Sequence, residues 1–421
     1  MTDRLDPRLY LRLVLLGAAV GIPAALAAAL FFALVHYLQH WLWTELPDAL
    51  GASVPPWYLV LGLPVVGAAI VLAARTLLPG DGGREPLEGL TVQPTPLAHA
   101  PGIVLAALGT LCFGAVLGPE SPVIALGMVV ALGLAFFARL GEKESGVIAT
   151  AGSFSAISAL FGGPIVAGVM LVEAGAGLGA ALIPALLPGF VAAAVGYLVF
   201  VGLGDWGGLD SPGLSVPDLP LYEGTHLLDL LVAIAVGLAT AVTIAVVGRL
   251  ATRVAVDGSR RFGIPALLLA GGLAVGLVAL LADGLGAGSE DVLFSGQSSI
   301  PTLVAESSTT VVLVLLVAKA LAYAVSLGCG FRGGPIFPAI FLGIGFATLP
   351  VVWFDVSPTF GVAAGAAAGM AAQSRLILTS MLFAALLVGT QGLDAVPAAV
   401  LAAVSAWLTA TALDGAPTAS R

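Results

Sequence analysis

The sequence of 421 residues is poor in charge. Asp, Glu, Lys and Arg together make up 9% of it, whereas 59% of its residues are hydrophobic. A soluble globular domain usually has roughly 25% charged residues. So few charges cannot cover the surface of a soluble protein, so most of the chain must face lipid or other buried apolar surface. The composition excludes a soluble globular fold.

Cysteine and histidine are also scarce. The two cysteines, Cys112 and Cys329, each lie in an apolar run, where cysteine behaves as a small hydrophobic residue. Two cysteines make neither a disulfide framework nor a metal site. The four histidines, at positions 36, 40, 99 and 226, do not have the spacing of metal ligands. We therefore expect no metal and no cofactor.

Long apolar runs are abundant instead. Those close to the ~20 residues that span a bilayer are 13–35, 57–78, 230–248, 263–282 and 311–328, and further runs between 102 and 200 and between 334 and 413 are interrupted by Gly and Pro. The first run is too long for a signal peptide. The pattern predicts an all-α polytopic protein of the cell (inner) membrane, embedded in a lipid bilayer.

The charges that are present predict an orientation. Arginines precede the first run and fill 249–261, which we expect to be a loop, whereas 202–229 and 283–306 carry only acidic charges. Positively charged segments stay in the cytoplasm. We expect the N-terminus and 249–261 inside, and the two acidic segments outside. The net charge of −9 comes largely from these outer segments and does not suggest nucleic-acid binding.

A repeated motif organises the chain. GPESPVIALG (118–127) and GPIFPAIFLG (334–343) are identical at six of ten positions, including both prolines and both end glycines. Ala-Gly pairs at 151 and 368 follow at nearly the same offset. We interpret the chain as two homologous membrane repeats, 1–220 and 221–421, with no soluble domain. Many transporters consist of such repeats, and their substrate sites lie on broken helices where the repeats meet.

Each copy of the motif predicts a helix start. Glycine permits a tight turn, and proline is tolerated in the first turn of the helix that follows. Unpaired N–H groups and the positive end of the dipole make a helix start an anion site. Two such starts aimed at one point could hold a dehydrated anion. The candidate anion-binding residues are Gly118, Ser121, Pro122, Gly334, Ile336 and Phe337.

Glu120 distinguishes the first copy, since the second has Ile336 there. A carboxylate at an anion-binding helix start can occupy the site in place of the substrate, and protonation would let it leave. The alternative is a Glu that merely caps its helix. Acidic residues at membrane depth are costly and usually functional, which favours Glu120 as a gate.

These motifs resemble those of the CLC family of chloride channels and chloride/proton antiporters. LGPESPVIALG resembles the family's G-x-E-G-P motif, whose Glu is the external gate, and GGPIFPAIFLG resembles G-x-F-x-P; FGGPIVAGVMLVEA resembles a third family segment. The similarity runs from about residue 10 to 413. It implies an inverted repeat with tilted, broken helices and a homodimer with one pore per subunit. It also implies small-anion and proton substrates.

The chain departs from the family in its expected anion ligands. Gly82 stands where the family has a serine hydroxyl, and the expected place of a tyrosine falls near Gln391 or Gly392. Tyr323, the last tyrosine, is too early for that role. Pro335 stands where the family usually has a backbone N–H, which proline lacks. These departures argue against assuming that the anion is chloride.

The residue that transfers protons has two alternative assignments. The closest alignment puts the family's inner proton-transfer glutamate on Ala174 and a structural glutamate on Glu173, whereas a one-residue shift gives Glu173 the proton role. Two basic residues, Lys319 in an apolar run and Arg332 beside the second motif, each have two interpretations. Lys319 faces the anion path or pairs internally, and we favour the internal pairing. Arg332 tunes the field of the pore or ends a helix.

The leading hypothesis is CLC-type anion transport, with anion/proton exchange gated by Glu120. The alternatives are a passive anion channel without proton coupling, or a carrier of an anion other than chloride. An intramembrane enzyme is disfavoured because no His or Lys has a suggestive spacing to the serines of the motifs. A membrane scaffold that moves no anion is the remaining hypothesis.

Overall fold

The structure is a computed structural model that describes residues 7–89, 95–176, 183–207 and 216–415. Part of the predicted outer segment 202–229 therefore lies outside the described residues. The described chain is helical, and its only β-type pairing is a bridge between Gly118 and Gly334. The prediction of an all-α membrane protein is confirmed, since eight helical stretches are long and apolar enough to cross a bilayer.

The first part of the chain forms seven longer helices and some short turns. The longer helices are α1 (Pro7–His40), α3 (Trp57–Leu77), α4 (Ala100–Leu111), α5 (Glu120–Phe137), α6 (Glu142–Leu160), α7 (Pro164–Ala174) and α8 (Ile183–Gly207). A π-helical turn, η1 (Trp41–Glu45), and α2 (Leu46–Ala49) extend α1, while η2 (Pro86–Glu88) and η3 (Leu97–His99) lie between α3 and α4.

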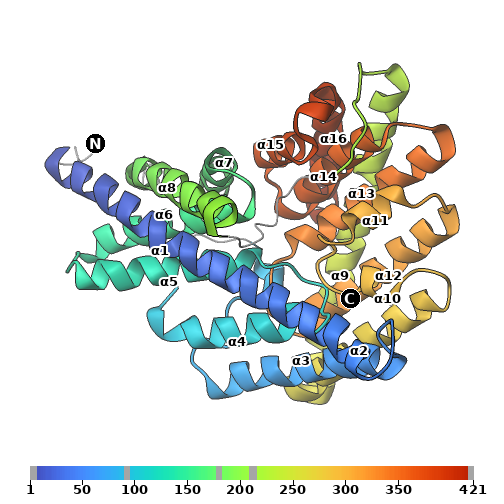
Figure 1. The fold of residues 1–421 in the computed structure, drawn as a ribbon, viewed down its shortest axis with the longest axis horizontal. Helices are drawn as coiled ribbons and strands as arrows, with labels where there is room; N and C mark the ends of the chain where they lie inside the picture. Colours follow the sequence, from blue (N-terminus) through green and yellow to red (C-terminus); the bar gives the residue numbers. More distant parts are fainter. Residues whose placement is uncertain (1–6, 90–94, 177–182, 208–215, 416–421) are drawn as a thin grey trace.

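The second part of the described chain forms six longer helices. Its longer helices are α9 (Leu227–Asp283), α12 (Thr309–Gly328), α13 (Ile336–Phe354), α14 (Pro358–Ser374), α15 (Ile377–Val388) and α16 (Val396–Gly415). The short elements α10 (Ser289–Val292), α11 (Ile300–Ala305) and η5 (Gly389–Ala395) connect them. In Figure 1, α1 and α4–α8 gather on one side of the molecule and α10–α16 on the other.

One predicted loop is wrong. Residues 249–261 are part of α9, which runs unbroken until Gly263, where the backbone takes a left-handed conformation before Pro265. The four arginines of this segment are exposed on helix rather than loop. The polar run interrupts the hydropathy but contains no proline, and its one glycine, Gly258, is helical, so the helix continues through it and turns only at the Gly-x-Pro sequence.

The last glycine of each motif copy has a packing role. Gly127 on α5 lies against the backbone of Gly152 on α6, and Gly343 on α13 lies against Gly365 on α14. A Cβ at either motif glycine would overlap a carbonyl oxygen of the facing helix. Small residues allow such close crossings in membrane helices. The two motif helices are thereby fixed against equivalent partners, α6 and α14.

Candidate functional site

The two motif copies meet through their backbones. The N–H of Gly118 donates to the carbonyl of Gly334 at 2.7 Å, and the N–H of Gly334 donates back to Gly118 at 2.6 Å. Two residues later in each copy a helix begins, α5 at Glu120 and α13 at Ile336, with a proline as N-cap in both cases. The structure therefore brings together the two helix starts that the sequence predicts as an anion site.

The carboxylate of Glu120 occupies the point between these helix starts. Its side chain is completely buried, and Oε1 accepts a hydrogen bond of 2.5 Å from the N–H of Ile336. The N–H of Phe337 also faces the carboxylate. The second oxygen, Oε2, is buried and has no hydrogen-bond partner among the described residues. An acidic group of the first repeat is thus held by the helix start of the second.

The space around this carboxylate explains both glycines of the bridge. A Cβ built on Gly118 or on Gly334 would overlap the side chain of Glu120. Neither glycine has a left-handed backbone, so lack of space rather than conformation requires them. The Glu120 carboxylate fills the space beside the bridge and faces the N–H groups at the start of α13.

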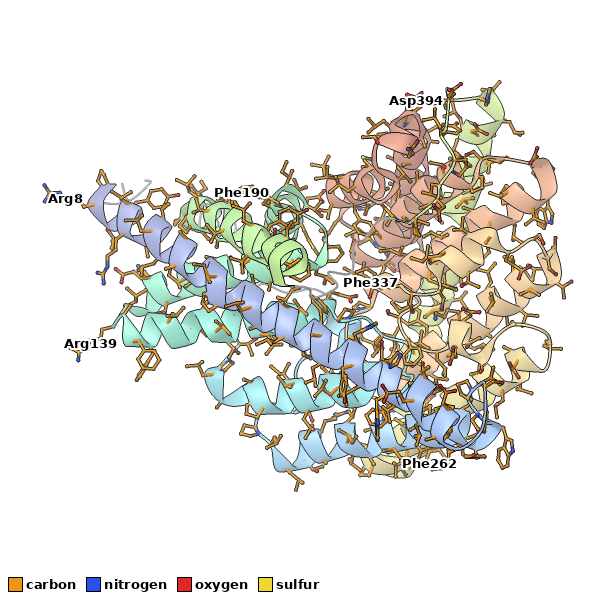
Figure 2. The ribbon with its side chains drawn as sticks, in the orientation of Figure 1. Arg8, Arg139, Phe190, Phe262, Phe337 and Asp394 are labelled. Carbon is orange, nitrogen blue, oxygen red and sulfur yellow. The ribbon has the colours of Figure 1, made fainter. Side chains whose placement is uncertain are left out.

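The ring of Phe337 packs away from this polar point. It stacks on Phe161, with 5.5 Å between ring centroids and 11° between planes, and Phe161 makes an edge contact with Phe383. Phe337 lies where the two groups of helices meet (Figure 2). The N–H group of Phe337 is therefore the part that can bind an anion, while its side chain packs between the two repeats.

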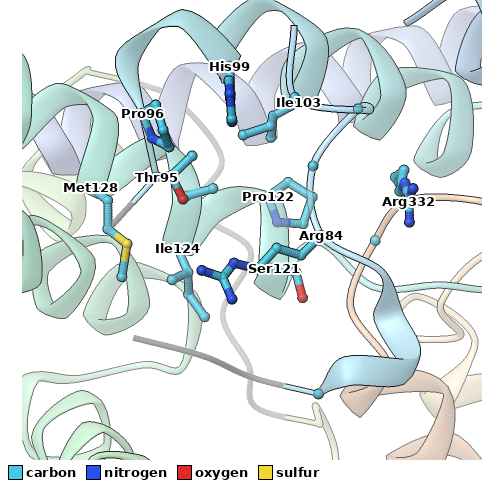
Figure 3. Close-up of a pocket in the computed structure, with 16 residues that line it drawn as sticks. Arg84, Thr95, Pro96, His99, Ile103, Ser121, Pro122, Ile124, Met128 and Arg332 are labelled. Atoms are coloured by element: carbon cyan, nitrogen blue, oxygen red, sulfur yellow. The ribbon is translucent and has the colours of Figure 1, made fainter. Parts of the chain in front are cut away.

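Ser121 and Pro122 face a different space, a cavity of about 280 Å³ next to the start of α5. Gly82, Arg84, Gly333 and the buried Arg332 line the same cavity, together with apolar side chains of α4 and α5 and with Thr95, Pro96 and His99 (Figure 3). The Ser121 hydroxyl makes no hydrogen bond with the described residues. The sequence placed Gly82 near the anion path, and in the structure it lines this cavity.

Arg332 belongs to an ion cluster that joins the repeats. Its guanidinium pairs with the carboxylate of Asp81, which also accepts hydrogen bonds from Arg75, and Glu85 lies 3.5 Å from its Nη1. The guanidinium of Arg75 further donates to the carbonyl of Gly330 at 3.0 Å. The pKa of Arg332 is lowered, because burial and the nearby Arg75 outweigh the carboxylates, which raise it. The cluster fixes the segment before Gly333 and Gly334.

Tyr323 is a site residue that the sequence interpretation missed. Its side chain is fully buried, and its hydroxyl donates to the carbonyl of Pro335 at 2.6 Å. Because Pro335 is the N-cap of α13, this hydrogen bond holds the helix start that binds Glu120. The comparison with the family directed attention to Gln391, whose carbonyl instead accepts from the N–H of Tyr222. A lone tyrosine in an otherwise apolar run was the available signal.

Lys319 lies one turn before Tyr323 on α12 and is held internally. Its ammonium donates to the carbonyls of Asp291 and Leu293, at 3.0 and 2.8 Å, and lies 4.5 Å from the ring centre of Phe341. The side chain is completely buried. The structure thus places Lys319 where it anchors the segment between α9 and α12, which fits the internal pairing.

Glu173 caps a helix. It stands near the end of α7, and its carboxylate accepts hydrogen bonds from the N–H groups of Leu378 and Thr379, both at 2.8 Å. The Thr379 hydroxyl adds a third bond of 2.5 Å. These donors belong to the first turn of α15, whose unpaired N–H groups a carboxylate satisfies well. The geometry matches the structural glutamate of the closest alignment.

Among the described residues, no cluster of three His, Cys, Asp or Glu side chains could hold a metal ion.

Comparison with curated proteins identifies relatives of similar length. The chain is 31% identical over 312 residues to the "Putative ion-transport protein YfeO" of Escherichia coli (strain SMS-3-5 / SECEC). The aligned region covers 72% of this chain and 70% of the relative. It is 32% identical over the same length to the protein of that name from Shigella boydii serotype 4 (strain Sb227).

Solved structures share the fold at low sequence identity. A CLC-type fluoride/proton antiporter matches 97% of this chain and 98% of its own, with a TM-score of 0.73 and 19% identity. A slow cyanobacterial Cl⁻/H⁺ antiporter matches 98% and 96%, with a TM-score of 0.76 and 16% identity. The sequence profile described as "Voltage gated chloride channel" matches residues 84–410. The protein therefore belongs to the voltage-gated chloride channel (CLC) family, and it is a membrane protein for anion transport.

Proposed function

We propose that the protein exchanges a small inorganic anion for protons and that Glu120 is its gate. One observation carries the proposal: the Glu120 carboxylate is buried between the starts of α5 and α13 and accepts the N–H of Ile336. A carboxyl group therefore occupies the proposed anion site. Such a group competes with the substrate for the same N–H donors.

The proposed cycle follows from that competition. While Glu120 is ionised, it remains on the donors of α13 and closes the path. Protonation removes its charge and weakens the charge-assisted hydrogen bond, which is about twice as strong as a neutral one. The side chain can then leave, and an anion takes its place between the two helix starts. Return of the carboxylate expels the anion and releases the proton.

The donors at this point are backbone N–H groups, which leaves the identity of the anion open. Gly82 offers no hydroxyl, and the Tyr323 hydroxyl is engaged with the carbonyl of Pro335. The structural neighbours transport fluoride in one case and chloride in the other. A carrier of an anion other than chloride therefore remains part of the proposal.

A passive anion channel is the second candidate, and the position of Glu173 favours it. A carboxylate that accepts three hydrogen bonds at the start of α15 is held by its partners. An exchanger without Glu173 in its proton path must use another route. The proton role of Glu173 is the alternative within the exchange proposal.

We further propose the setting in which the chain acts. It is a carrier rather than an enzyme, a homodimer in the cell (inner) membrane with a cytoplasmic N-terminus, and its repeats are 1–220 and 221–421. The four longer helices that follow each motif copy, α5–α8 and α13–α16, support the division into repeats. The exposed arginines in the middle of α9, before Gly263, support the orientation.

Reconstitution into liposomes tests the exchange. An anion gradient is applied without a pH gradient, and the internal pH is followed with a fluorescent dye. Exchange predicts that protons move in the direction opposite to the anion and build up a pH gradient where none was applied. Anion flux that moves no protons would support the passive channel, and absence of flux for halides, nitrate, bicarbonate and fluoride would contradict both candidates.

A further inference from the structure

The arginine-rich segment of α9 lies between two stretches that are each long enough to cross a bilayer. The apolar runs 230–248 and 263–282 flank it, and each has close to the ~20 residues that span the hydrocarbon core. The segment 249–262 therefore lies at one face of the membrane, at the level of the lipid headgroups. A Cβ built on Gly258 would overlap the side chain of Leu267, so the chain bends sharply between these two residues.

Three arginines of this segment have no partner in the part of the chain that the structure describes. Arg253, Arg260 and Arg261 are exposed and make no hydrogen bond or ion pair with the described residues. Their helical spacing puts them on one face of α9. Asp257, the only acidic residue of the segment, shares this face but forms no ion pair with them. Arg249 differs, because its guanidinium donates to a carbonyl near the end of α16.

Exposed apolar side chains accompany these arginines. Phe262 is 67% exposed, and Val256 and Ile264 are exposed as well. Phe262 lies at the edge of the molecule (Figure 2). Arginines next to exposed apolar side chains are typical of segments in the membrane interface, where the apolar groups enter the acyl region and the charged groups reach the headgroups.

The charge of the segment distinguishes between classes of lipid. The planar fork of a guanidinium presents two parallel N–H groups, which match two oxygens on the phosphorus of a headgroup. A zwitterionic headgroup also carries a positive charge, which the arginines repel, whereas an anionic headgroup keeps a net negative charge. Clusters of basic residues directly beside a membrane span attract anionic lipids for this reason.

We propose that the bend of α9 binds an anionic phospholipid, with the three arginines at its phosphate and Phe262 at its acyl chains. The inference goes beyond the proposed function, because it requires neither anion exchange nor a gate at Glu120. It gives the exposed arginines a binding partner in addition to their effect on the orientation of the chain.

Native mass spectrometry of the purified full-length protein tests the proposal by measuring which lipids it retains. The protein, in an uncharged detergent, receives equal amounts of phosphatidylglycerol and phosphatidylcholine with identical acyl chains. We expect about tenfold more bound phosphatidylglycerol than phosphatidylcholine. The double variant Arg260→Gln/Arg261→Gln should reduce this ratio to about twofold or less, because each arginine near a charged surface contributes roughly fivefold.

The matched control is Arg139→Gln/Lys143→Gln. It removes the same charge from two exposed residues at the connection between α5 and α6, and it should keep the preference for phosphatidylglycerol. Inorganic phosphate in excess over the lipid, compared with chloride at equal ionic strength, should also leave the ratio unchanged. Loss of the preference in phosphate alone would assign the arginines to a free phosphate ion and contradict the lipid site.

Three further outcomes overturn the proposal: the wild-type protein retains both lipids equally, Arg260→Gln/Arg261→Gln leaves the ratio unchanged, or the control variant loses the preference to the same extent. If Arg260→Gln/Arg261→Gln does not elute as a folded protein, Asp257→Asn decides. Removal of this acidic side chain should raise the ratio severalfold, and an unchanged ratio would contradict the proposal.

Discussion

Removal of the Asp81 carboxylate tests the ion cluster that joins the two repeats. In Asp81→Ala, the guanidinium groups of Arg332 and Arg75, which are 3% and 7% exposed, lose the carboxylate that they share. Breaking a buried pair by removing one partner costs about 3–5 kcal/mol. Asp81 itself is 55% exposed and Glu85 remains near Arg332, so solvent screening reduces the expected loss to about 2–3 kcal/mol.

The matched control is Glu85→Ala. Glu85 is 56% exposed, and its oxygen lies 3.5 Å from the Arg332 guanidinium, so this pair contributes at most about 1 kcal/mol. The assay is thermal unfolding in detergent, followed by intrinsic fluorescence. We expect Asp81→Ala to lower the midpoint clearly and Glu85→Ala to lower it little. Equal effects of the two substitutions, or no effect of either, would refute the idea that burial of the arginines sets the cost.

Three further substitutions address single residues of the site. Glu173→Gln leaves one acceptor oxygen at the start of α15, so it should lower thermal stability by about 1–2 kcal/mol while proton coupling persists in liposomes; loss of coupling at unchanged stability would instead assign Glu173 to the proton path. Tyr323→Phe removes the hydroxyl that holds the start of α13, so stability should fall by about 1 kcal/mol and anion flux should slow; a flux equal to wild type would mean that the hydrogen bond does not position the site. Phe337→Ala should cost about 3–5 kcal/mol, and Phe337→Leu much less, in the same unfolding assay; similar losses would contradict the packing role of the ring.

The helix starts could be predicted from sequence because local chemistry determines them. Gly-Pro before an apolar run limits where a helix can begin, and α5 and α13 begin at Glu120 and Ile336 as that pattern indicates. The meeting of the two starts could be inferred only from the repeat. The course of α9 through 249–261 could not be predicted, because a polar stretch with one Gly and no Pro is compatible with either a loop or a helix.

Residues that act through distant partners were the hardest to assign. Glu173 and its partner Thr379 are 206 positions apart, and nothing near Glu173 in sequence indicates a capping role. Tyr323 was dismissed by its position, although its hydroxyl reaches the N-cap of α13. Both assignments depend on the packing of α7 against α15 and of α12 against α13. Such contacts between helices are not encoded in any local pattern.

The pH dependence of anion flux through Glu120→Gln tests the central claim most directly. The amide fills the same space as the carboxylate but cannot ionise, so it competes weakly for the N–H of Ile336 at every pH. In liposomes, wild-type flux should rise as the pH falls, because protonation releases the gate. Flux through Glu120→Gln should be insensitive to pH and should move no protons. A variant whose flux and pH dependence match the wild type would show that Glu120 is not the gate.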